Sequence, residues 1–195
     1  MYQTSETKVR RKGEPSARRL RCRAALLLSA VSLAVILLGS AAYALNVECP
    51  PSISGESCIG TDGADVMRGT EGIDSIVGLG GGDVIHGLGA PDRLTGDGNP
   101  ATTPGNDQLF GGAGSDDLVG GAGSDRLAGE RGDDHVSADF LFSDGTDTVE
   151  GGPGDDTVYA VEGQRDIIDC GPGRDQVQFD AGLDSVKRCE IKEAN

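Results

Sequence analysis

The sequence predicts an all-β chain that folds as a right-handed parallel β-roll (a β-solenoid) of about six turns, preceded by a helical signal peptide. Three observations lead to this prediction. Glycine supplies 32 of 195 residues, more than twice its usual share of about 7%. Residues 60–187 divide into thirteen nine-residue units, each with aspartate at the sixth position and an apolar residue at the eighth. A basic stretch and an apolar run precede this array.

Residues 1–44 have the order of a secretory signal peptide. Eight basic residues lie within residues 1–23, an apolar run begins at Ala24, and Ala42-Tyr43-Ala44 matches an A-x-A cleavage site. We expect cleavage after Ala44 and a secreted, extracellular protein. The alternative is an uncleaved anchor, because residues 24–44 could just span a bilayer and would hold the protein on the outer face of the membrane.

Cleavage would leave four cysteines, Cys49, Cys58, Cys170 and Cys189. An even number outside the membrane suggests two disulfide bonds, for which three pairings are possible. Locality favours Cys49–Cys58 and Cys170–Cys189, one at each end of the repeat array. A zinc site is the alternative, but none of the four residues forms a C-x-x-C pair.

The repeat array of residues 60–187 lies between an N-terminal cap at 45–59, which carries one cysteine pair, and a C-terminal tail at 188–195. Insertions at 99–104 and 138–141 interrupt it. Glycines at positions one, two and four of a unit permit positive φ and a close approach of the backbone to an ion. Because side chains alternate along a strand, only the eighth residue of the short strand at positions seven to nine faces inward. Two units then form one coil, and coils stack about 4.8 Å apart.

The sixth-position aspartates are the candidate metal ligands, since calcium prefers carboxylate and carbonyl oxygens at about 2.3–2.6 Å. We therefore expect several Ca²⁺ ions as cofactors. Ile73 and Pro91 make two of the loops less regular, which places Asp74 and Asp92 second among the candidates. The main candidates are Asp65, Asp83, Asp107, Asp116, Asp125, Asp134, Asp147 and Asp156.

This array resembles the RTX (repeats-in-toxin) family, whose nonapeptide G-G-x-G-x-D-x-U-x builds a calcium-binding parallel β-roll. The resemblance implies that calcium lies between the loops of units n and n+2, held by the sixth-position aspartates and backbone carbonyls. The endings D-C-G-P-G-R-D at 169–175 and R-C-E at 188–190 are closer to small exported actinobacterial calcium-binding proteins. A signal peptide and cysteines depart from the usual RTX pattern. The implied pairs are Asp65 with Asp83, Asp107 with Asp125, Asp116 with Asp134, and Asp134 with Asp156.

Charge and missing motifs narrow the function to a secreted calcium-ion-binding protein that is not an enzyme. From Leu45 onward, 30 acidic and nine basic residues give a formal net charge of −21, which repels nucleic acid and anionic lipid and attracts cations. No H-E-x-x-H or G-x-S-x-G motif occurs, and His86 and His135 occupy outward-facing positions. The expected partners are calcium ions, without nucleic acid and, after cleavage, without a membrane; a macromolecular partner is unknown.

The alternative function is a calcium-rigidified cell-surface adhesion or structural module that binds another macromolecule. Phe140, Leu141 and Phe142 would form its contact patch, although the same residues could plug the roll. A disordered acidic spacer has no reason to keep aliphatic residues in phase. We expect the array to be largely disordered or molten without calcium and to fold on binding it, with a weak affinity of about 10⁻⁴–10⁻³ M.

Overall fold

The computed structural model describes residues 46–49, 57–98, 103–139, 145–161 and 163–194. Within them, sixteen strands form two eight-stranded sheets and there is no helix. Sheet A has the order β1-β3-β5-β7-β9-β11-β13-β15, and sheet B has the order β16-β14-β12-β10-β8-β6-β4-β2. The strands are β1 (Asn46–Glu48), β2 (Cys58–Ile59), β3 (Val66–Arg68), β4 (Ser75–Leu79), β5 (Val84–Gly89), β6 (Arg93–Asp97), β7 (Gln108–Ala113), β8 (Asp117–Gly121), β9 (Arg126–Arg131), β10 (His135–Asp139), β11 (Thr148–Glu150), β12 (Thr157–Ala160), β13 (Ile167–Asp169), β14 (Gln176–Phe179), β15 (Ser185–Lys187) and β16 (Ile191–Ala194).

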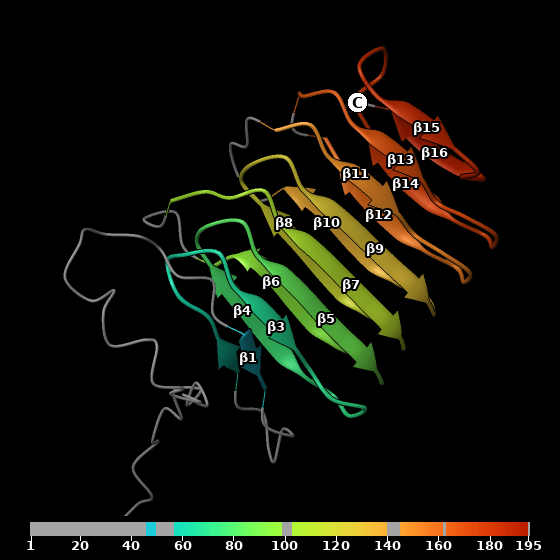
Figure 1. Ribbon diagram of the computed structural model, residues 1–195. Helices are drawn as coiled ribbons and strands as arrows, with labels where there is room; N and C mark the ends of the chain where they lie inside the picture. The colour runs from blue at the N-terminus through green and yellow to red at the C-terminus, as the bar shows by residue number, and fades with distance from the viewer. Residues whose placement is uncertain (1–45, 50–56, 99–102, 140–144, 162, 195) are drawn as a thin grey trace, which may run out of the picture.

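The chain alternates between the two sheets, so that each strand pairs in parallel with the strand two places along. Two nonapeptides therefore make one coil, and Figure 1 shows the coils stacked in chain order from blue-green β1 to red β15 and β16. Eighth-position residues stay in register: Ile85 lies beside Leu109, and Leu109 beside Leu127. This architecture is the all-β parallel solenoid that the nine-residue period predicts.

The core is a double row of eighth-position side chains between the sheets. Alternation of side chains puts residues seven and nine of each unit on the outer faces and leaves one inward residue per strand. Burial of these aliphatic side chains away from water is the main favourable contribution of the core to folding. Twelve of these residues are at most 1% exposed: Met67, Ile76, Ile85, Leu94, Leu109, Leu118, Leu127, Val136, Val149, Val158, Ile168 and Val177.

The ends of the roll are longer than the sequence predicted. Strands β1 and β2 lie in the segment expected as a cap, and β16 lies in the segment expected as a tail. These strands pair with β3, β4 and β14, so the roll has about seven turns where six were expected. At the last coil Lys192 stands opposite Val177 and is exposed, which gives the end of the solenoid the polar surface that solubility requires.

One expected insertion begins later than the sequence suggested. Ala138 was assigned to the insertion, but it is fully buried and lies in β10, where Asp139 stands opposite Gly121. Ala138 therefore takes the first position of a unit, since its carbonyl oxygen lies beside Gly120 as that of Gly129 lies beside Gly111. Phe140, Leu141 and Phe142 lie outside the described residues, as do the signal peptide and the possible anchor. Within the described part, no helix is long and apolar enough to cross a membrane.

Two disulfide bonds close the ends of the roll. Cys49 is bonded to Cys58, with their Cα atoms 5.6 Å apart, and Cys170 is bonded to Cys189, with a Cα separation of 5.2 Å. This is the pairing that short loops favoured. All four side chains are buried and extend the apolar core at the first and last coils.

Candidate metal sites in the carboxylate ladders

The sixth-position carboxylates form two ladders along the roll, one beside the start of each sheet's strands. Ladder A precedes the strands of sheet A, and ladder B precedes those of sheet B. The sixth-position aspartates from Asp65 to Asp175 are nearly or fully inaccessible to solvent, at 0–3% exposed. Ladder A consists of Asp65, Asp83, Asp107, Asp125, Asp147, Asp166 and Asp184; ladder B consists of Asp74, Asp92, Asp116, Asp134, Asp156, Asp175 and Glu190.

Hydrogen bonds join each residue of a ladder to the next residue of the same ladder. The backbone N–H of each sixth-position aspartate from Asp65 to Asp175 donates to a carboxylate oxygen of the ladder residue one coil further on, at N–O distances of 2.7–3.0 Å. Units n and n+2 are therefore in contact through these side chains. The four pairs that the family resemblance implied, from Asp65 with Asp83 to Asp134 with Asp156, all show this contact.

The second oxygen of many of these carboxylates is buried without a hydrogen-bond partner in the described structure. An unsatisfied buried polar atom costs free energy comparable to a lost hydrogen bond, and more when it is charged. A repeated orphan in one chemical position therefore indicates a missing ligand. The atoms concerned are Oδ2 of Asp83, Asp92, Asp107, Asp116, Asp134, Asp156 and Asp175.

First-position glycines shape the space beside these oxygens. A Cβ built on Gly129 would lie closer than 3.0 Å both to Oδ2 of Asp134 and to the carbonyl oxygen of Gly151 in the next coil. Gly111 has the same relation to Asp116 and to the carbonyl of Gly129. Each such space is thus bordered by one carboxylate and one carbonyl oxygen. Hard oxygen donors of these two kinds are the ligands of calcium.

The loops differ in the residue at their second position. We call a loop closed where this residue donates hydrogen bonds to Oδ2 of the sixth-position aspartate, and open where Oδ2 is an orphan. Gly112 has a φ of 111° and Glu130 a φ of 73°, a left-handed conformation that favours glycine. In the first unit Thr61 takes this position, and its N–H and hydroxyl both donate to Oδ2 of Asp65, at 2.7 and 2.9 Å. Thr70 closes the loop of Asp74 in the same way, at 2.6 and 2.9 Å. In these two loops, protein donors thus bind the Oδ2 atom that is an orphan in the open loops.

Burial shifts the acidity of the ladder carboxylates. Desolvation, reinforced by neighbouring carboxylates and opposed by backbone hydrogen bonds, raises the pKa of Asp83, Asp107 and Asp134 to about 7. The same causes raise the pKa of Asp92 to about 7 and that of Asp156 to about 6. Burial thus disfavours the ionised form of these carboxylates, and a nearby positive charge would favour it. A bound divalent cation would supply this charge.

The donor set fits calcium better than a transition metal. Among the described residues no three histidine, cysteine or carboxylate side chains converge on one point, as a zinc site would require. A cation here would take one or two carboxylates and complete its shell with backbone carbonyls and water, as calcium does with its six to eight oxygen ligands. The four cysteines of the described part, Cys49, Cys58, Cys170 and Cys189, are bonded in disulfides.

Comparison with known families agrees with this geometry. The RTX calcium-binding nonapeptide repeat matches residues 59–94, 102–136 and 143–177, which together are more than half of the chain. The chain belongs to the RTX calcium-binding nonapeptide repeat family. A comparison with curated proteins finds no match. RTX membership means that calcium is the ion to consider at the ladders, without giving the number of ions.

Three further carboxylates have an orphan oxygen or belong to a ladder, but were not among the candidates from the sequence. Asp175 has the same orphan oxygen as its neighbours in ladder B. Glu190 completes ladder B by accepting the N–H of Asp175 at 2.9 Å, although it follows that residue by only 15 positions. Asp97 lies at the second position of the interrupted unit and has a buried orphan Oδ1. Asp175 was in phase and could have been included, whereas nothing in the nine-residue spacing pointed to Asp97 or Glu190.

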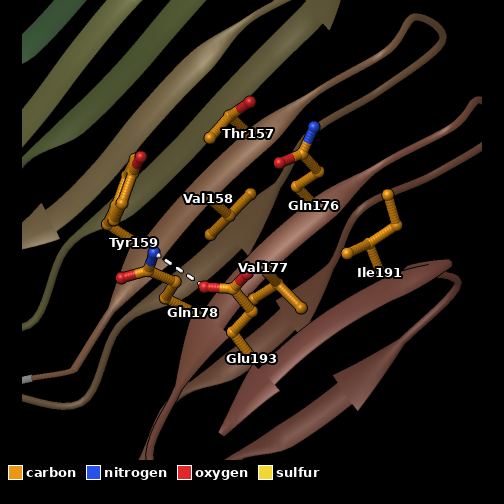
Figure 2. A pocket seen from close by; sticks show the side chains of 8 residues that line it. All are labelled: Thr157, Val158, Tyr159, Gln176, Val177, Gln178, Ile191 and Glu193. Carbon is orange, nitrogen blue, oxygen red and sulfur yellow. Dashed lines mark hydrogen bonds between the residues drawn. The ribbon is translucent and has the colours of Figure 1, made fainter. Parts of the chain in front are cut away.

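The outer faces carry ordinary strand-to-strand contacts. His86 stacks on Phe110 with ring centroids 4.8 Å apart, and Nδ1 of His135 lies 3.4 Å from Asp117. Figure 2 shows a hollow on sheet B, where Gln178 donates to Glu193 at 3.2 Å beside Tyr159. Its volume is only about 60 Å³.

Proposed function

We propose that this chain is a secreted calcium-ion-binding repeat protein whose β-roll folds on calcium, or is stabilised by it, and that it performs no catalysis. The repeated orphan oxygen beside a glycine and a carbonyl carries this proposal. Each ion would join adjacent coils and balance carboxylates that burial otherwise disfavours. Since the metal-binding free energy becomes folding free energy, calcium outside the cell would act as the folding signal.

The sites that we propose differ in expected strength. The open loops of Asp83, Asp92, Asp107, Asp116, Asp134 and Asp156 have an orphan oxygen beside a first-position glycine, so they are the first candidates for occupancy. Asp125 and Asp147 belong to ladder A, together with Asp83 and Asp107, and stay in the proposed set of calcium ligands. In the loops of Asp65 and Asp74 threonine donors take the place of the ion, so we assign these two residues a mainly structural role.

Calorimetry and circular dichroism test the proposal together. Titration of the chelator-treated protein should show several bound calcium ions with Kd values of about 10⁻⁴–10⁻³ M, and either the β-structure or its resistance to unfolding should increase over the same range. Magnesium serves as the control, because it holds its water more tightly and demands a stricter geometry. Full β-structure in excess chelator, with no heat on adding millimolar calcium, would refute the proposal. The N-terminal sequence of the exported protein tests cleavage after Ala44.

A further inference from the structure

Asp97 lies where the neighbouring coils have no carboxylate. It is the second residue of the unit whose sixth-position aspartate is Asp107, and in sheet B it stands opposite Leu79 on one side. On the other side its backbone lies against Gly121, since a Cβ on that glycine would come closer than 3.0 Å to the Cβ of Asp97. A carboxylate thus replaces leucine or glycine at a point where two coils touch.

One oxygen of Asp97 is held by the backbone and the other is not. Oδ2 accepts the N–H of Ala122 at 3.2 Å and that of Gly105 at 3.4 Å, both long for hydrogen bonds to a carboxylate. Oδ1 is buried and has no hydrogen-bond partner in the described structure. A carboxylate that served only to hold these two amides would have no need to bury its second oxygen.

Further hard oxygens lie next to Gly96, the residue that precedes Asp97. This glycine has no room for a side chain, because its Cβ would lie closer than 3.0 Å to Oδ2 of Asp107 and to the carbonyl oxygen of Gly120. Oδ2 of Asp107, a residue only 1% exposed, is itself an orphan. The charge of Asp97 is also close enough to raise the pKa of both Asp83 and Asp107.

We propose that Asp97 is an additional side-chain ligand for a cation bound at Asp107 and the carbonyl of Gly120, which makes this the tightest of the calcium sites. This inference rests on the proposed function, since it assigns a further ligand to one of its sites. Affinity at oxygen sites rises with the number of anionic ligands. Because the Coulomb attraction scales with the charge of the ion, the same site should prefer a trivalent lanthanide over calcium more strongly than the other loops do.

The test compares Asp97→Asn with Glu193→Gln in the full-length protein. Asparagine keeps an oxygen for the two backbone N–H groups but loses the charge, while Glu193→Gln removes one charge from the outer face of sheet B, away from both ladders. Calorimetric titrations with calcium and with terbium provide the readouts. We expect Asp97→Asn to weaken the tightest calcium site by about tenfold or more and its terbium affinity by a larger factor, while Glu193→Gln titrates like the wild type.

Each outcome has a separate meaning. An Asp97→Asn variant that titrates like Glu193→Gln would overturn the inference and leave calcium binding by the other loops in place. Equal losses for calcium and terbium would also overturn it, because a purely structural defect does not depend on the charge of the ion. If the wild type itself binds no calcium, the proposed function fails first. Should Asp97→Asn not fold, Asp97→Glu, which keeps the charge, should restore the preference for terbium.

Discussion

The backbone N–H of Asp116 donates to Oδ1 of Asp134 at 2.8 Å, while Oδ2 of each residue is buried without a hydrogen-bond partner in the described structure. One oxygen therefore holds adjacent coils together, and the other is left for an ion. Because the two oxygens have different roles, a substitution can separate the contact between coils from the binding of an ion. Asparagine at the same position can keep the acceptor oxygen while removing the negative charge.

Asp116→Asn should have opposite effects on the two states of the protein. Without calcium it removes a buried charge that has no compensating cation, so the free energy of unfolding should stay the same or rise. With calcium it removes an anionic ligand, so affinity at this loop should fall by about tenfold or more. Calorimetry gives the affinity, and urea unfolding in chelator and in calcium gives the stability.

Asp117→Asn is the matched control for that experiment. Asp117 is the next residue, but it lies on the outer face of sheet B, where it pairs with Arg93 at 2.9 Å. Surface ion pairs contribute at most about 1 kcal/mol, so this variant should bind calcium like the wild type. A similar loss of calcium affinity in both variants would show that net charge, and not ligation, governs binding.

The nine-residue period of the sequence was enough to predict which residues meet across coils and which side chains are buried. The relation of Asp116 to Asp134 and the burial of Leu118 between the sheets follow from a spacing of two units per coil. What the sequence could not show depends on single side chains. Asp97 lies in an interrupted unit, where the phase of the second position is ambiguous until the backbone is known. Glu190 is the wrong residue type at the wrong spacing, and only the strand that follows it brings it into the ladder.

The two threonine-closed loops should be the part of the roll that depends least on calcium. Thr61→Ala removes a hydroxyl that donates to the carboxylate of Asp65 at 2.9 Å. A hydrogen bond to a charged group contributes about 1.5–3 kcal/mol, so the chelator-treated protein should lose about that much stability. Hydrogen exchange of the amide protons of β3 in chelator would report the loss locally. Thr148→Ala, on the outer face of sheet A, is the control and should leave exchange in β3 unchanged.

The glycine at position 129 should be required for both packing and ion binding at its loop. In Gly129→Ala the new methyl group would meet Oδ2 of Asp134 and the carbonyl of Gly151, so one or both oxygens must move. We expect calcium binding at this loop to be lost and stability in calcium to fall by about 1–3 kcal/mol, the usual cost of overpacking. Gly72→Ala is the control, because its Cβ would make only an ordinary contact of 3.6 Å with Oγ1 of Thr70. Equal effects of the two variants would argue against a specific cradle.

Proton binding should oppose calcium binding between about pH 4 and pH 7. Burial raises the pKa of Asp83, Asp92, Asp107 and Asp134 to about 7 in the metal-free roll, against about 3.9 in an unfolded chain. The folded state without metal therefore binds more protons than the unfolded state over this range. The contribution of these carboxylates to its stability is fully present below about pH 4 and is lost as the pH rises through about 7.

Calcium reverses this dependence, because it binds the ionised carboxylates and must displace their protons. We expect the stability gained from calcium to be larger at pH 8 than at pH 5, and the calcium concentration at half-folding to rise as the pH falls below about 7. Thermal unfolding at pH 5 and pH 8, in chelator and in calcium, measures both trends. Calorimetry in two buffers with different ionisation enthalpies counts the protons released. If the chelator-treated protein became more stable from pH 5 to pH 8, or released no protons on binding calcium, the buried ladder carboxylates could not be the ligands.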